Sequence, residues 1–194
     1  MSADLAEKHA EGLLRACYLF AENLGDCVIT AVLEQIGDVE AAKNESYKNE
    51  INYQLMVCEI AHCNIYVVAV GLRSRGLLTD SYCQSVTKAY QEKVEDHINE
   101  SYQKVYSQFA HLPGAGEIWK SVIANYEDPL KPYYTSSNDP SDPTKTFVGT
   151  LVERLNHRLF AEAFHDVVRG TVFEAGPVVF RRLSELTKEK PQNW

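Results

Sequence analysis

The sequence predicts an all-α protein, an antiparallel four-helix bundle with one or two short additional helices. Apolar residues recur at steps of three and four through four long segments, and no segment shows the sustained alternation of a β-strand. The connections after the first and second segments are short, so neighbouring helices are expected to run antiparallel. We expect residues 1–194 to form a single helical domain, which is large enough to bury a sizeable core.

The first half of the chain predicts two long helices. The first runs from about residue 3 to residue 40, and its apolar face includes Ala6, Ala10, Leu13, Leu14, Cys17, Ala21, Leu24, Val28 and Ala31. Residues 39–49 are mostly polar and predict a break. The second helix runs from about 47 to 73, and its end is indicated by Arg73, Arg75 and Gly76, because cations and glycine favour a helix C-terminus.

A third long helix and a short one are predicted next. Thr79 and Asp80 are both suitable N-caps for the third helix, and the glycine- and proline-containing stretch 113–116 interrupts it. The short helix covers residues 117–127. Residues 129–145 hold four prolines among polar residues, which predicts a loop.

The last quarter of the chain predicts the fourth long helix. Asp142 followed by Pro143 is typical of a helix start, and apolar residues continue at helical spacing as far as Phe173. Gly176 and Pro177 are expected to break this helix, and residues 177–188 are expected to form a final short one.

Charge and composition narrow the expected partners and location. The 27 acidic residues outnumber the 19 basic ones, so neither nucleic acid nor an anionic membrane surface is an expected partner. Residues 1–12 lack a signal-peptide pattern, and polar residues interrupt the longest apolar run, 55–72, so no membrane span is expected. The five cysteines contain no C-x-x-C pair, which predicts reduced thiols and a cytoplasmic location.

Glu59 and His62 lie within the most apolar segment of the chain. They are three residues apart, hence on one face of the second helix, which should occupy the middle of the bundle. An uncompensated carboxylate in that position would cost several kcal/mol. We therefore expect an arginine, a proton or a metal ion beside Glu59.

A second Glu-x-x-His pair, Glu162 and His165, lies in the predicted fourth helix. Two such pairs on two long helices resemble the ferritin-like di-iron carboxylate proteins, which add one Glu from each of the other two helices. The resemblance implies that Glu59 and Glu162 bridge or chelate two iron ions and that His62 and His165 each cap one. It further implies oxidation of a small-molecule substrate with dioxygen, or iron handling. Manganese and zinc are alternative metals.

Glu22 and Glu95 are the candidates for the two remaining carboxylates. Counting residues from the connecting turns places both level with Glu59 in an antiparallel bundle. His97 and Glu127 are alternatives to a glutamate on the third helix.

The competing hypothesis is a non-catalytic helical module that binds a partner helix or a small ligand, either alone or as a homodimer. In that case Glu59 and His62 belong to a buried polar network that sets helix register. Glu59 and His62 then pair with each other or with one of three nearby cations on the later helices, Arg154, Arg158 or Arg169.

Overall fold

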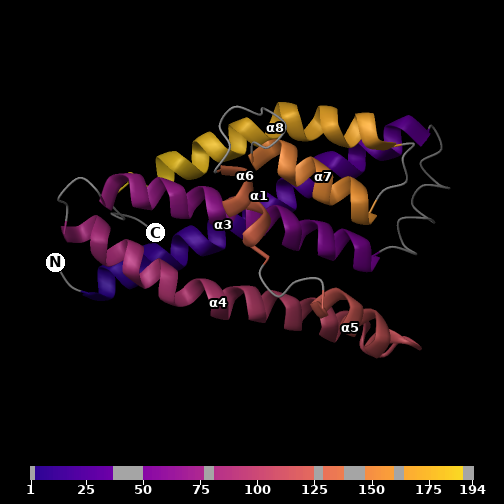
Figure 1. Cartoon of the computed structure of the whole chain (residues 1–194), viewed down its shortest axis with the longest axis horizontal. Helices are drawn as coiled ribbons and strands as arrows, with labels where there is room; N and C mark the ends of the chain where they lie inside the picture. The colour runs from indigo at the N-terminus through magenta and orange to yellow at the C-terminus, as the bar shows by residue number, and fades with distance from the viewer. Residues whose placement is uncertain are drawn as a thin grey trace.

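A computed structural model describes residues 3–36, 50–76, 81–124, 129–137, 147–159 and 164–189 of the chain. Within these ranges all the regular structure is α-helical, which confirms the predicted fold class. The described helices, shown in Figure 1, are α1 (Ala3–Ile36), α3 (Glu50–Gly76), α4 (Ser81–Phe109), α5 (Ala115–Ala124), α6 (Lys131–Ser137), α7 (Phe147–Leu159) and α8 (His165–Leu186).

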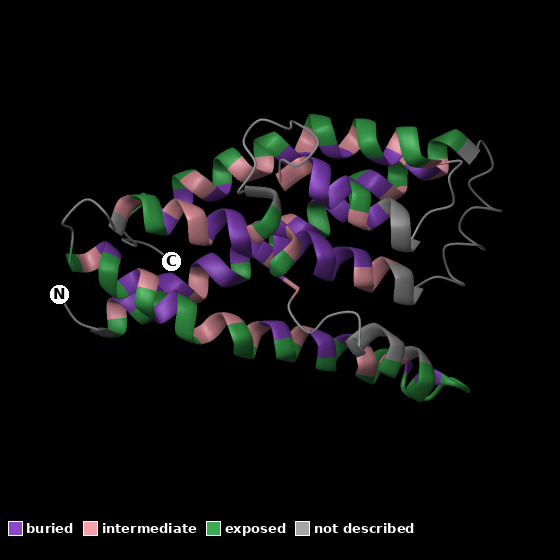
Figure 2. Ribbon diagram, in the orientation of Figure 1, coloured by how far each residue is buried: buried purple, intermediate pink, exposed green. Residues whose placement is uncertain are grey.

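Helix α3 lies at the centre of the molecule. It packs against α1, α4, α7 and α8, and α1 in turn contacts both α4 and α8. Every residue from Met56 to Val68 is buried, as the continuous purple stretch of α3 in Figure 2 shows. A helix that is apolar nearly all round requires such a position, so the central place predicted for it is confirmed.

Two segments are long and apolar enough to cross a membrane, judged by length and composition alone: Asp4–Gln35 and Tyr53–Arg75. The most apolar window of Tyr53–Arg75 is 83% buried inside the protein, whereas that of Asp4–Gln35 is 39% buried. The apolar character of α3 is thus used in packing against its neighbours.

The predicted loop over residues 129–145 is wrong in part, because it contains α6. Pro132 lies in the first turn of this helix, where a missing N–H costs no intrahelical hydrogen bond. Leu130 and Tyr133 are buried, so packing against the core stabilises a helix of only seven residues. The proline count alone did not distinguish a first-turn proline from a loop proline.

The predicted fourth helix is also wrong in its boundaries. Helix α7 ends at Leu159 and α8 begins at His165, and the two helices pack against each other (Figure 1). Helix α8 continues through Gly176 and Pro177, where a break was expected. Pro177 is exposed, so the carbonyl that loses its helical donor can be hydrated, while buried Gly176 packs beside Val148.

The other boundaries agree with the predictions to within a few residues. Helices α3, α4 and α5 begin at Glu50, Ser81 and Ala115, close to the expected starts. The expected end of the first helix at residue 40 and the break around 39–49 extend beyond Ile36, outside the described residues.

Gly25 marks a close approach between α1 and α3. A Cβ atom at this position would lie 3.3 Å from both Met56 Cε and Val57 Cγ2. A larger side chain must therefore displace the core of α3.

We expect Gly25→Leu to lower the free energy of unfolding by about 1–3 kcal/mol, because it overfills this contact. Gly116→Leu is the control, since a Cβ at Gly116 meets no atom within 4 Å. Urea unfolding monitored by circular dichroism measures both effects. Equal stability of the two variants would contradict the close approach.

Candidate functional site

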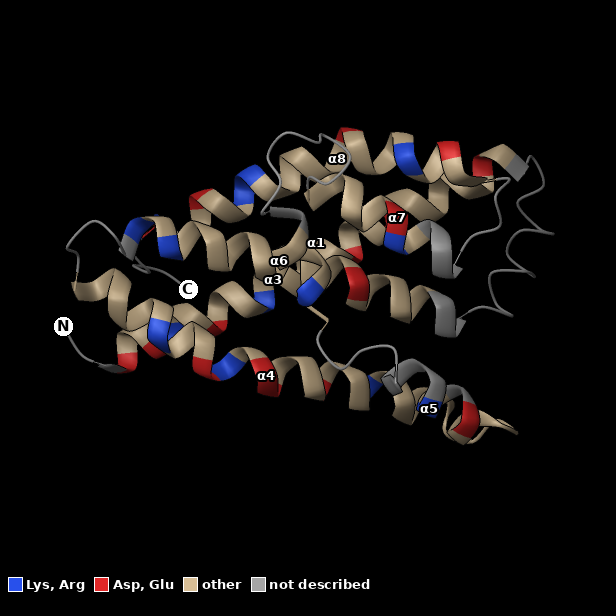
Figure 3. Cartoon of the chain, in the orientation of Figure 1, with Lys and Arg blue, Asp and Glu red and all other residues tan. Residues whose placement is uncertain are grey.

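Glu59 is the one carboxylate in the buried core of the described chain, with 1% of its surface exposed. The guanidinium of Arg154, on α7, forms a bidentate ion pair with Glu59: Nε donates to Oε1, and Nη2 donates to Oε2 over 2.8 Å. The other described Asp, Glu, Lys and Arg side chains are at least partly exposed, and Figure 3 shows these residues mainly on the outward faces of the helices. The positive charge of Arg154 thus compensates the buried negative charge of Glu59, as one of the alternatives expected from the sequence.

Tyr133 of α6 donates a further hydrogen bond to Glu59. Its hydroxyl donates to Glu59 Oε1 over 2.9 Å, and its side chain is fully buried. Tyr66, one helical turn beyond His62, stacks against Tyr133 and meets the rings of Tyr134 and Phe147 edge to face. This aromatic group packs beside the ion pair, in which the Glu59 side chain is 2% exposed and that of Arg154 is 16% exposed.

Burial acts on the two titratable groups of the cluster in opposite ways. For Glu59, burial by itself raises the pKa, but the hydrogen bonds and charge of Arg154 outweigh it, so the net pKa is lowered. For His62, burial lowers the pKa to about 4, although the nearby Glu59 carboxylate acts against the change. The cluster at neutral pH therefore holds an ionised Glu59, a charged Arg154 and a neutral imidazole.

The other groups around His62 are uncharged. The imidazole meets the ring of Tyr102 edge to face, with 5.5 Å between the ring centres. Cys58 and Cys63, which flank the Glu-x-x-His pair, are buried, and burial raises the pKa of the Cys58 thiol to about 12 and that of Cys63 well above its usual value. Both are therefore protonated thiols at neutral pH.

The structure does not gather the remaining predicted ligands around Glu59 within the residues it describes. Glu22 and Glu95 are exposed. His165 opens α8 with its side chain 48% exposed, and its Nδ1 lies 3.6 Å from Asp166. In the described ranges no group of three or more His, Cys, Asp and Glu side chains lies close enough together to hold a metal ion. Glu162 falls outside those ranges, so the complete metal site stays a prediction.

The alternative candidates lie elsewhere. His97 is half-buried between α1 and α4, with its Nε2 3.2 Å from Glu11 Oε2 and its ring stacked on Tyr18. Glu127 lies outside the described residues. Arg158 belongs to α7, but its side chain is not among those described.

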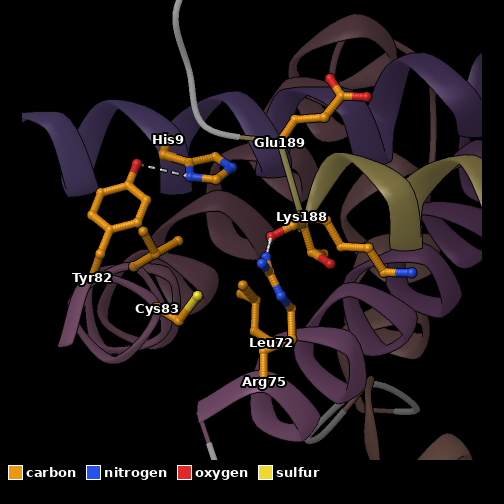
Figure 4. A pocket seen from close by; sticks show the side chains of 9 residues that line it. His9, Leu72, Arg75, Tyr82, Cys83, Lys188 and Glu189 are labelled. Carbon is orange, nitrogen blue, oxygen red and sulfur yellow. Dashed lines mark hydrogen bonds between the residues drawn. The ribbon is translucent and has the colours of Figure 1, made fainter. Parts of the chain in front are cut away.

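A small pocket lies at the other end of α3, where α1, α3, α4 and the turn after α8 meet (Figure 4). It was not predicted from the sequence. The signal was present, since His9 falls on the apolar face of α1 between Ala6 and Leu13. The pocket is lined by His9, Leu72, Arg75, Tyr82, Cys83, Val86, Thr187, Lys188 and Glu189.

His9 and Arg75 use this pocket to hold the C-terminal end of α8. The Nε2 atom of His9 lies 3.4 Å from the Leu186 carbonyl oxygen, which only accepts, so Nε2 carries the proton and Nδ1 accepts from the Tyr82 hydroxyl over 3.1 Å. Arg75 donates to the Thr187 carbonyl. The Leu186 carbonyl also accepts from the Glu189 N–H over 3.2 Å, so His9 and Arg75 add side-chain donors to the carbonyl groups at this helix end. The pocket is accordingly a helix-capping site.

No family model, curated protein or solved structure matches this chain. The fold and the site define the class as an all-α protein with a buried Glu–Arg–Tyr cluster on its central helix. What the protein does is therefore argued from this geometry alone.

We expect Arg154→Met to lower the free energy of unfolding by about 3–5 kcal/mol, because it leaves the Glu59 carboxylate buried without its cation. Arg73→Met, at an exposed position of α3, is the matched control and should change stability by less than about 0.5 kcal/mol. A double-mutant cycle with Glu59→Gln, followed by urea unfolding, should give a strongly non-additive result. Additive effects would contradict the buried pair.

Stability should also depend on pH through His62. Its pKa is about 4 in the folded protein and near 6.5 in the unfolded chain, so the unfolded chain binds more protons between these values. The contribution is fully present above pH 6.5 and is lost as the pH falls towards 4.

Between pH 7 and pH 4.5, the wild type should therefore lose about 2–3 kcal/mol more stability than His62→Gln does. His111→Gln is the control, because His111 is exposed and should leave the wild-type pH dependence intact. Urea titrations at both pH values measure the difference. Parallel curves for the wild type and His62→Gln would refute a neutral, buried His62.

Proposed function

We propose that this protein is a non-catalytic helical interaction module, whose buried polar cluster organises the fold and whose binding surfaces lie on the outside of the helices. The observation that carries the proposal is the engagement of both carboxylate oxygens of Glu59 by Arg154, with Tyr133 also donating to Oε1. Bridging carboxylates stabilise metal ions with the same lone pairs that these donors occupy.

The charge balance of the cluster supports the same conclusion. One negative charge on Glu59 is matched by one positive charge on Arg154, and His62 is neutral. A guanidinium in direct contact with the carboxylate also repels any cation that approaches it. The cluster therefore has no net charge and needs no further ion to balance it.

The cluster joins three elements that are distant in the sequence. Glu59 belongs to α3, Tyr133 to α6 and Arg154 to α7, so their hydrogen bonds set the position of α6 and α7 along the central helix. A buried ion pair of this kind contributes little net stability compared with an apolar core, but it penalises every arrangement that separates its partners. We assign it the role of fixing the register of α6 and α7 on α3, the central helix of an antiparallel four-helix bundle of α1, α3, α4 and α8.

A second candidate function is the di-iron oxidoreductase or iron-handling protein that the two Glu-x-x-His pairs predict, with manganese or zinc as alternative metals. The specific observation in its favour is that Glu59 and His62 are buried together and that His62 is neutral, as a metal ligand must be. Glu59 would have to leave Arg154, and Glu22, Glu95 and His165 would have to turn inward from exposed positions. These movements make it the weaker candidate.

The five cysteines of the chain are all free, and four of them are buried. This agrees with the reduced thiols that the sequence predicts. A cytoplasmic location is proposed on that basis.

The test is metal content together with metal-dependent stability. After expression with iron, manganese and zinc supplied, we expect the purified protein to contain these metals well below one per chain. Its thermal unfolding midpoint should be the same with each metal as with a chelator, because a ligand that binds the folded state must raise it.

Stoichiometric iron that is lost in His62→Ala but kept in His111→Ala would overturn the proposal in favour of the metal site. The same outcome measured with manganese or zinc would identify the metal. His111 is the appropriate control because it is exposed in the turn after α4.

A further inference from the structure

The outer face of α8 combines exposed apolar side chains with alternating charges. Phe173 is 45% exposed and Val178 is 64% exposed, and they account for two of the four large hydrophobic side chains exposed in the described chain. Pro177, also exposed, lies between them. Steps of three and four residues place Phe173, Pro177 and Arg181 along one line and Glu174, Val178 and Arg181 along the next. We call Phe173, Glu174, Pro177, Val178 and Arg181 the α8 face.

We propose that the α8 face binds the same face of a second copy of this chain, with the two α8 helices antiparallel about a two-fold axis between Pro177 and Val178. The inference deepens the proposed function, on which it rests, by naming the partner of the interaction module.

Charge complementarity favours this arrangement. Glu174 and Arg181 lie at equal distances on either side of the proposed axis. The two-fold operation therefore sets Glu174 of each copy opposite Arg181 of the other and makes two equivalent ion pairs around the apolar centre. A parallel pairing would instead set Glu174 against Glu174 and Arg181 against Arg181.

Helix α8 carries no net charge although the chain is acidic. The formal net charge is −8 for the whole chain, so two copies repel each other. Residues His165–Leu186 carry three basic side chains, Arg169, Arg181 and Arg182, and three acidic ones, Asp166, Glu174 and Glu185. Two copies that meet through α8 therefore add little to this repulsion.

Sedimentation equilibrium of the full-length protein tests this interface. We expect the wild type to form a dimer whose dissociation constant rises at least about tenfold in Glu174→Arg and again in Arg181→Glu, because each reversal creates two like-charge contacts. The double variant Glu174→Arg with Arg181→Glu should restore the dissociation constant to near the wild-type value, since it exchanges the partners of each pair. Val178→Lys should abolish the dimer.

Two controls separate the α8 face from general effects of charge and exposed apolar surface. Glu100→Arg reverses an exposed charge on α4, and Leu19→Lys removes the exposed leucine of α1, which is 58% exposed. Neither should change the dissociation constant by more than about threefold. Circular dichroism of every variant shows whether it is folded, and the double variant has the same composition as the wild type.

A wild type that is monomeric at the highest soluble concentration would overturn the inference. So would a dimer that tolerates both single reversals, or one that the double reversal fails to restore. Metal analysis of the same samples separates this outcome from failure of the proposed function: a metal-loaded dimer contradicts only the non-catalytic assignment, and a metal-free monomer contradicts only the α8 interface.

Discussion

The buried carboxylate of Glu59 is the constraint on which much of the structure depends. A charge at this depth in an apolar core is tolerated only with a partner, and Arg154 provides two donors and the opposite charge. To deliver that partner, α7 must lie against α3, and α6 must bring Tyr133 over the pair. The hydrogen bonds and the charge of Arg154 offset the cost of burying Glu59, and the same contacts fix the relative positions of three helices.

Other polar residues of α3 follow the same rule along its length. The amide of Asn64 donates to the Cys17 carbonyl of α1 over 2.9 Å, and the Tyr90 hydroxyl of α4 donates to the Ile65 carbonyl over 3.0 Å. At the far end, Arg75 donates to the Thr187 carbonyl beyond α8. Each neighbour of the central helix is therefore attached by a directional bond as well as by apolar packing, which specifies the arrangement more narrowly than packing alone.

The outer surface of the helices carries the side chains that a partner can reach. Inside the core, the Glu59 carboxylate is engaged by Arg154 and Tyr133. The side chains open to a partner are exposed ones, such as Phe173 and Val178 on α8. Pro177 is exposed on the same surface, and α8 continues through it because the carbonyl left without a donor can be hydrated there.

The amino-acid sequence by itself determined the helical class, the central place of α3 and the need for a partner to Glu59, because periodicity and buried charge are local properties. It left that partner open among His62, three arginines, a proton and a metal ion. Only the tertiary structure selected Arg154 and added Tyr133, since α6 is stabilised by burial of Tyr133 rather than by its own short sequence. The capping role of His9 was likewise decided by helices that meet in space, over a separation of 177 residues from Leu186.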